Sequence, residues 1–215
     1  MDLTPRQALD AIIPASPPSI ESSRLLLRPI THADIPAVFA IRSRPEVARH
    51  NHPKRPFQSL AETHEWLKGK TFTGPGQATG RSFTFAIVDK SRIAPQDSVI
   101  GYVSINTLEP SPEIGYSLLP EVWGRGYATE ALQMMLKVWW DLPRTSLDDS
   151  LEKEHVYAIC EQENHGSCHV LRKCGFEVVR EDVYQTTPLF VWALGRPSND
   201  HDQSTEYRYI KVQRS

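Results

Sequence analysis

Apolar residues follow two rhythms along the chain, and each rhythm predicts a different kind of element. Runs rich in leucine, isoleucine, valine and phenylalanine, such as RLLLRPI at 24–30 and FTFAIV at 83–88, are typical of β-strands. Between Ala128 and Trp140 the apolar positions instead recur at i, i+4, i+7, i+8 and i+11, which predicts a helix packing one face on a sheet. The chain therefore combines strands with amphipathic helices.

The order of these elements predicts a mixed sheet. Short connections join the strands up to residue 119, which favours an antiparallel meander. The helix at 128–140 then leads to a strand at 156, and a helix of this length can connect two parallel strands. We therefore expect an α/β (α+β) fold with about six or seven strands and about four helices. The expected strands lie at 24–30, 83–88, 99–106, 113–119, 156–160, 177–183 and 189–194, and the expected helices at 34–45, 59–68, 128–140 and 166–174.

Length and composition indicate one domain with two extensions. A chain of 215 residues with 40% apolar residues suits a single domain with a real core. The Pro- and Ser-rich residues 1–20 predict an N-terminal arm, and 21–197 the folded domain. Residues 198–215 form a C-terminal extension in which 207–212 is a candidate added strand.

Charge and cysteine content limit the partners and the cellular compartment to be expected. With 24 Lys and Arg against 26 Asp and Glu, nothing favours nucleic acid or an anionic membrane as a partner. No apolar run approaches the ~20 residues of a membrane helix, and the start of the chain is not typical of a secretory signal. Three cysteines without scaffold spacing favour a reducing, cytoplasmic setting. Cys168 with His165 and His169 is a conceivable metal cluster, but we favour a small buried thiol beside surface histidines and expect no metal.

Two glycines, Gly124 and Gly126, lie between a strand end and a helix start. Glycine lets backbone N–H groups approach a ligand, and the first N–H groups of a helix have no partner within it. Because the helix dipole also favours anions, this turn is typical of a pyrophosphate cradle, to which Arg125 adds charge. A Walker loop is excluded because no Gly-Lys-Ser/Thr follows, and a dinucleotide G-x-G-x-x-G is excluded because position 129 is threonine.

Two stretches together resemble the GNAT superfamily of acetyltransferases. EIGYSLLP precedes WGRGYATEAL, and a later strand precedes NHGSCHVLRKCGFEVV. Gly124 and Gly126 match the family pattern Gln/Arg-x-x-Gly-x-Gly/Ala, although Glu121 replaces Gln/Arg. Trp123 is usual in the branch that includes the ribosomal-protein N-terminal acetyltransferases, to which residues 21–196 are most similar. The residues that match the second motif are Asn164, Ser167, Lys173, Gly175 and Phe176.

The resemblance implies an enzyme that transfers an acetyl group from acetyl-CoA to a primary amine, either a protein N-terminal α-amine or a small-molecule amine. It implies a V-shaped split between the parallel strands at 113–119 and 156–161, with the pantetheine arm in the split and the pyrophosphate on 124–129. A backbone N–H of Leu118 or Leu119 is the implied oxyanion donor. The residues implied to bind acetyl-CoA are Leu118, Leu119, Trp123, Gly124, Arg125, Gly126, Tyr127, Ala128, Thr129, Asn164 and Ser167.

Direct attack, as the family implies, needs a base for the amine and a proton donor for the leaving thiolate. Many relatives place a tyrosine seven residues after the motif asparagine, and that position is Leu171 here. Ser167 is the branch-typical substitute, with helix capping as its alternative role, and Tyr184 is a more distant candidate. Glu113 and Glu161 flank the expected split and are the candidate bases, although each is alternatively an exposed strand-end carboxylate.

The roles of five further side chains stay open at this stage. Nothing in the sequence fixes the geometry of the loop histidines, and Cys160 is either an acyl carrier near the thioester or, as we favour, a buried thiol. Asn164 either bonds the pantetheine amides or caps the following helix. The loop histidines are His32, His50 and His52.

Two other functions compete with the transferase. The first is a catalytically weak acyl-CoA-binding or regulatory module, which Leu171 and Glu121 favour. The second is a nucleotide-binding protein, which the missing Lys-Ser/Thr disfavours. The acceptor is unreadable because family acceptor contacts come from loops, here near 43–58 and 184–188, and loops vary freely.

Overall fold

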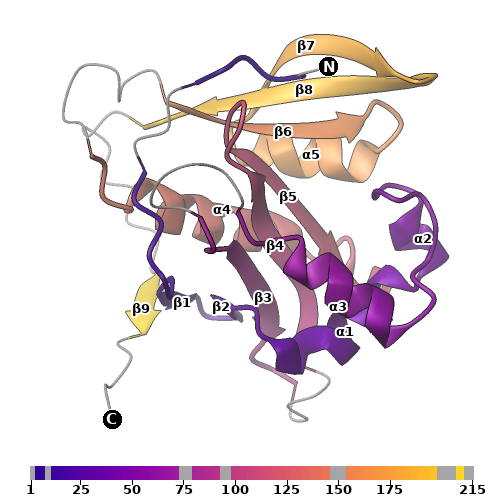
Figure 1. Ribbon diagram of the computed structural model, residues 1–215, viewed down its shortest axis with the longest axis vertical. Helices are drawn as coiled ribbons and strands as arrows, with labels where there is room; N and C mark the ends of the chain where they lie inside the picture. Colours follow the sequence, from indigo (N-terminus) through magenta and orange to yellow (C-terminus); the bar gives the residue numbers. More distant parts are fainter. Residues whose placement is uncertain are drawn as a thin grey trace.

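The computed structural model describes residues 3–7, 11–72, 79–92, 98–145, 154–197 and 207–210, which form a nine-stranded sheet flanked by helices (Figure 1). The strands are β1 (Ser19–Glu21), β2 (Leu25–Pro29), β3 (Phe83–Asp89), β4 (Val99–Thr107), β5 (Glu113–Leu118), β6 (His155–Glu161), β7 (Glu177–Tyr184), β8 (Thr187–Gly195) and β9 (Arg208–Ile210). The helices are α1 (Ile35–Arg42), α2 (Pro45–Ala48), α3 (Leu60–Lys68), α4 (Tyr127–Trp140) and α5 (His165–Lys173), with 3-10 turns η1 (His32–Asp34) and η3 (Pro120–Val122).

The sheet is mixed, as the sequence predicts. Its strand order is β7-β8-β6-β5-β4-β3-β2-β1-β9. Neighbouring strands from β1 to β5 pair antiparallel, β5 and β6 pair parallel, and β6, β8 and β7 pair antiparallel again. A parallel pair therefore lies in the middle of an otherwise antiparallel sheet.

The sheet has more strands than the sequence predicts. The expected six or seven become nine because β1 and β9 extend the far edge, where β1 pairs with both β2 and β9. Each is only three residues long, too short to show an alternating pattern. β1 crosses the expected boundary between the arm and the domain, and β9 lies within the candidate strand at 207–212, of which 211–212 is outside the described residues.

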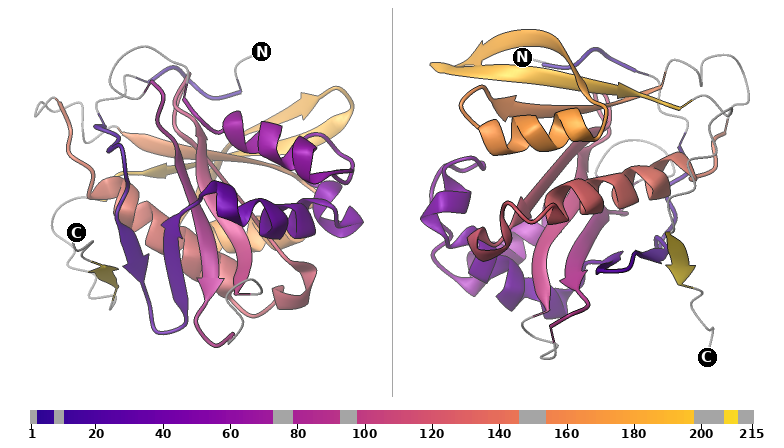
Figure 2. Two further views of the ribbon diagram at one scale, coloured as in Figure 1. Left: turned by 60° about the horizontal axis from the view of Figure 1, so that its bottom comes forward. Right: turned by 180° about the vertical axis from the view of Figure 1, so that it is seen from behind.

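Helices cover both faces of the sheet (Figure 2). α1 and α3 pack together on one face, where Tyr102 of β4 contacts Trp66 of α3 with ring centroids 5.1 Å apart. α4 and α5 lie on the other face over the main core. Trp139 of α4 is fully buried there against Phe83, whose ring centroid is 5.6 Å away, so the predicted apolar face of α4 does pack on the sheet.

Local signals set the helix ends. The Ser59 side chain accepts a hydrogen bond from the N–H of Glu62 and caps α3. Gly175, with φ +86°, follows α5 in the left-handed conformation that ends a helix. The helix expected from Asp34 starts as η1 and continues as α1, and Pro45 begins the separate four-residue α2.

Some predicted features lie outside the described residues. They are the loop at 74–76, the turn around residue 95, most of the connection at 141–154 and the linker at 198–206. Within the described ranges, no helix is both long and apolar enough to cross a membrane.

Candidate functional site

The glycine turn forms an exposed cradle at the start of α4. Gly124 and Gly126 have φ of +74° and +80°, in the left-handed region that glycine tolerates best. Among the described residues, no acceptor takes the N–H groups of 124–129, so these groups point their partial positive charge outward. A Cβ on Gly124 would have nothing within 4 Å, so the surface above this glycine is open to a ligand.

Arg24 braces the cradle, a role that the sequence did not reveal. Its guanidinium lies over the Tyr127 ring, 4.7 Å from the centroid, and donates to the carbonyl of Arg125 at 3.1 Å. It also forms an ion pair with Glu130 in the first turn of α4. Trp123, which is 47% exposed, donates its indole N–H to the carbonyl of Leu118 at 2.9 Å. These contacts tie the turn to β2 and to the end of β5.

A split opens between β5 and β6 beside the cradle. The two strands pair at one position, Glu113 with Tyr157, and then diverge. The N–H of Leu119 donates to the carbonyl of Ile100 at 2.9 Å, so Leu119 is not free to donate into the split. Since N–H groups alternate in direction along a strand, Leu118 turns its N–H away from β4 and into the split. Leu118 therefore remains the candidate oxyanion donor.

The start of α5 borders the split on its helix-covered side. The Asn164 side chain accepts from the N–H of Ser167 at 3.1 Å, so Asn164 is the N-cap of α5. Ser167 is near the hydroxyl of Tyr116, whose buried oxygen makes no hydrogen bond to any of the described residues. Burial raises the pKa of Tyr116 well above its usual value, which keeps the hydroxyl protonated. Leu171 is 2% exposed and belongs to the core.

Sequence reasoning missed Tyr116. This residue stands in the EIGYSL strand that carries the resemblance, but the alternation of a strand does not say which helix a side chain meets. Only the packing of α5 against β5 and β6 brings the Tyr116 hydroxyl to Ser167.

Cys160 has the surroundings of a structural thiol. Its sulfur lies 3.7 Å from that of Cys168 and accepts the indole N–H of Trp192 at 3.2 Å. Burial raises the pKa of Cys160 to about 12, so the nucleophilic thiolate is scarce. No set of three or more potential metal-binding side chains occurs in the described ranges, and His165 and His169 are exposed on α5.

Glu161 ends β6 within a network of charged side chains. Lys54 forms an ion pair with it, and the Nδ1 of His50 lies 3.1 Å from its other oxygen. Arg49 donates to the Nε2 of His50 at 2.8 Å, which leaves Nδ1 as the protonated nitrogen that donates to Glu161. Burial alone would raise the pKa of Glu161, but Lys54 and His50 outweigh it and hold the pKa below its usual value. Lys54 also contacts Thr187 at 3.3 Å, so the loop after α2 reaches β8.

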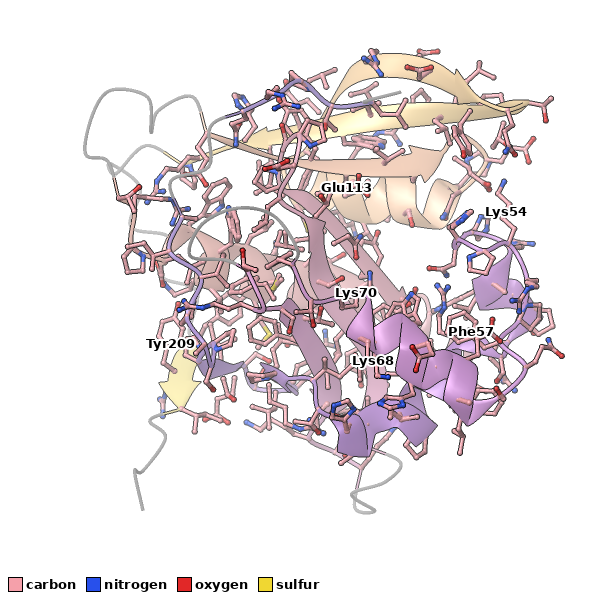
Figure 3. All side chains as sticks on the ribbon, in the orientation of Figure 1. Lys54, Phe57, Lys68, Lys70, Glu113 and Tyr209 are labelled. Atoms are coloured by element: carbon pink, nitrogen blue, oxygen red, sulfur yellow. The ribbon has the colours of Figure 1, made fainter. Side chains whose placement is uncertain are left out.

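Glu113 has the opposite environment. It lies at the start of β5, where the split begins, and burial raises its pKa above the usual value. Lys70, which follows α3, is the cation that partly offsets this rise. Figure 3 shows both side chains on the face of the sheet that carries α1 and α3.

The remaining candidates lie elsewhere. Tyr184 is 54% exposed at the end of the edge strand β7. His32 packs edge-on against His64 of α3, with ring centroids 5.1 Å apart, and the carbonyl of His52 accepts from Arg42 at 2.7 Å. The structure thus brings Glu113, Leu118 and Ser167 to the split, together with residues 123–129 of the cradle and the cap Asn164.

Comparison with known proteins agrees with this arrangement. The model of the acetyltransferase (GNAT) domain matches residues 24–177. Bacillus subtilis (strain 168) has a similar protein, named uncharacterized N-acetyltransferase YoaA, which is 27% identical over 171 residues, 78% of this chain and 89% of that protein. Two solved structures share the fold. The ribosomal L7/L12 α-N-protein acetyltransferase RimL, in complex with coenzyme A, has a TM-score of 0.62, 18% identity and coverage of 81% of this chain and 95% of that one.

The other solved structure is the spermidine N-acetyltransferase of Vibrio cholerae, in complex with CoA and spermine. Its TM-score is 0.59 at 18% identity, and the match covers 81% of this chain and 97% of that one. At such identities these two structures show the likeness of the fold alone. The family model, in contrast, spans most of the chain and includes both the cradle and the split, so the chain belongs to the GNAT acetyltransferase family.

Proposed function

We propose that this protein transfers the acetyl group of acetyl-CoA directly to a primary amine, and that its preferred acceptor is an α-amine of a peptide N-terminus or a small molecule. The split between β5 and β6 carries the proposal, because it joins an anion cradle to a free backbone donor and to a carboxylate on the opposite face.

The chain fits acetyl-CoA at both ends of this path. N–H groups at 124–129 face outward at the positive end of α4 and suit a pyrophosphate. The N–H of Leu118 points into the split and would donate to the carbonyl oxygen of the thioester. When bound, acetyl-CoA supplies the activated acetyl group, and every other function falls to the protein.

Glu113 is the better of the two candidate bases. A general base works best with a pKa near the working pH, and burial moves Glu113 in that direction. Glu161 moves in the opposite direction because Lys54 and His50 stabilise its charged form. We assign proton removal from the amine to Glu113, and to Glu161 the task of holding the loop at 49–54 against β6.

Ser167 and Tyr116 together supply the proton for the leaving thiolate. The Tyr116 hydroxyl is near Ser167 where the split meets α5, it makes no hydrogen bond to other described residues, and burial keeps it protonated. This pair takes the place of the tyrosine that many relatives have at the position of Leu171.

The weakness of the base favours an α-amine. At pH 7 roughly a tenth of an α-amine is neutral, whereas only about four in ten thousand lysine side chains are. A single, partly exposed carboxylate therefore deprotonates an α-amine more easily than a lysine side chain. The resemblance of Trp123 and the glycine turn to the branch that includes the ribosomal-protein N-terminal acetyltransferases favours the same preference.

A pair of peptides tests the proposal. One has a free N-terminus and a blocked lysine, and the other has the reverse. We expect the enzyme to consume acetyl-CoA in the presence of the peptides, and to acetylate the peptide with the free N-terminus faster. Faster acetylation of the second would point to a stronger base elsewhere. CoA binding in calorimetry with no turnover of any amine would instead favour the acyl-CoA-binding module, with which the core position of Leu171 is compatible.

A further inference from the structure

Asn106 occupies an irregular position next to the split. β4 and β5 pair Ile105 with Ile114 and then Thr107 with Glu113, so Asn106 is an extra residue in a β-bulge. Bulges redirect side chains and are frequent next to active sites. Asn106 lies on the same face of β4 as Ser104, two residues before it, and the Ser104 hydroxyl lies 2.6 Å from the Asn106 side-chain oxygen.

Lys70 fixes which end of the Asn106 amide is which. Its ammonium lies 2.5 Å from one atom of the amide, and an ammonium can only donate. That atom must therefore be Oδ1, which Ser104 also contacts. Lys70 is in turn held over the ring of Trp66, 4.7 Å from the centroid. The NH₂ end of Asn106 is left to face the other way.

The NH₂ end of Asn106 lies over Gly115 in β5. A Cβ built on Gly115 would be 2.5 Å from Nδ2, so any other residue at this position would displace the amide. Gly115 lies two residues after Glu113, the position at which β5 and β6 diverge. Both Glu113 and Gly115 are partly exposed. An N–H donor therefore lies against β5, two residues from the candidate base, on the face opposite α4 and α5 where Figure 3 shows Glu113 and Lys70.

We propose that the Asn106 amide, oriented by Lys70, donates to the carbonyl oxygen that follows the acceptor amine, so that the enzyme selects α-aminoacyl compounds over polyamines. This inference rests on the proposed function and names the chemistry of its acceptor. An α-aminoacyl compound carries its carbonyl two bonds from the amine nitrogen. The amine meets Glu113 while the carbonyl meets Asn106. A polyamine has no oxygen to accept from Asn106, and it brings a second cation toward Lys70 and Arg42.

The experiment compares acceptors across variants. L-alaninamide has the carbonyl, 2-aminobutane replaces the carboxamide with an ethyl group, and spermidine is the polyamine. Because these amines differ in pKa, the measured quantity is the change in the ratio of their kcat/KM values between variants. Asn106→Leu removes the donor, and we expect it to lower kcat/KM for alaninamide about tenfold and to leave that for 2-aminobutane within about twofold.

Two further variants keep the test sharp. Asn106→Asp keeps the shape of the side chain and its contacts to Lys70 and Ser104, but replaces the N–H donor with an anion. We therefore expect kcat/KM to fall for alaninamide and to rise for spermidine. Lys70→Met frees the amide to rotate and should reduce the preference for alaninamide severalfold. Lys68→Met is the matched control, since this exposed lysine pairs only with Glu65 among the described residues and should leave the ratio unchanged. CoA affinity and melting temperature confirm that each variant folds.

The outcomes are distinguishable. The assignment of Asn106 as the donor to the acceptor carbonyl is supported if the ratio of kcat/KM for alaninamide to that for 2-aminobutane falls in Asn106→Leu and Lys70→Met but not in Lys68→Met. Equal losses for alaninamide and 2-aminobutane in both Asn106 variants overturn it and leave the transferase function standing. No turnover of any amine by the wild-type protein overturns the proposed function, and this inference with it.

Discussion

The surroundings of each carboxylate at the split, rather than its residue type, determine which role it can take. Glu113 and Glu161 are both strand-end carboxylates, yet burial raises the pKa of the first while Lys54 and His50 lower that of the second. Two carboxylates whose pKa values are pushed apart usually have different tasks. The sequence gives both residues as candidates, and their partners, distant along the chain, separate them.

The paired hydroxyls yield a first prediction. Ser167→Ala and Tyr116→Phe should each lower kcat about 10²-fold with little change in CoA affinity, which is typical of general acid–base groups. Because the two act as one unit, the double variant should be little worse than either single variant. Tyr157→Phe, which removes a hydroxyl from a separate cluster, is the control. Effects of only a few fold would leave Ser167 with a purely structural role at the start of α5.

The buried ammonium of Lys70 yields a second prediction. Burial and, to a smaller extent, Arg42 lower its pKa to about 8, although Glu113 acts against the change. In the unfolded chain a lysine has a pKa of about 10.4, so between these values the unfolded state binds more protons and stability rises with pH. The free energy of unfolding of Lys70→Met, compared with that of the wild type, should therefore be most favourable at pH 7. This difference should shrink by roughly 1–3 kcal/mol by about pH 10.4, as the wild type gains stability.

Denaturant unfolding at the two pH values measures this difference. Lys68→Met again serves as the control, because its side chain is exposed and its burial cost is absent in both states. A Lys70→Met effect independent of pH would mean that the ammonium is well solvated.

Among the elements, the turn between β5 and α4 has the clearest signal. Gly124 and Gly80 have nearly equal φ, +74° and +77°, and a Cβ on either would have nothing within 4 Å. Gly124→Val and Gly80→Val should thus cost similar stability through backbone strain. Only Gly124→Val should weaken CoA binding in calorimetry, by about tenfold or more, because a side chain would displace the phosphate from the N–H groups. Equal CoA affinity in both variants would place the pyrophosphate elsewhere.

How far the sequence predicts an element depends on the range of the interactions that define it. The glycine turn of the cradle is local: two glycines and the helix that follows determine its backbone, and the sequence predicts this turn, although not the contacts from Arg24. The bulge at Asn106 is not local, because it depends on the register with β5. The orientation of the Asn106 amide depends on Lys70, 36 residues away. Short strands at the far edge fall between these cases, since β1 pairs along the edge that β2 presents and β9 along the edge that β1 presents.

Across the whole molecule, the split divides the sheet into two parts that meet at one parallel register. β1 to β5 with α1 and α3 lie on one side, and β6 to β8 with α5 on the other (Figure 2). Lys54 and His50 bridge from the loop after α2 to Glu161 across this divide. The sequence predicts the parallel pair from its crossover helix, but not this bridge, whose partners are more than 100 residues apart.

Hydrogen exchange of individual amides tests whether the split is the ligand channel. The N–H of Ser117 faces β4 within the antiparallel ladder, whereas the N–H of Leu118 faces the split, where β6 has already diverged. Without ligand, Leu118 should therefore exchange faster than Ser117. Bound CoA fills the split and gives Leu118 an acceptor, so its exchange should slow, by about tenfold or more, while that of Ser117 changes little. Residue-resolved NMR exchange with and without CoA measures both amides in one sample. Equal protection of the two amides in the free protein would show that β5 and β6 remain closed in solution, and a Leu118 amide unaffected by CoA would remove it as the oxyanion donor.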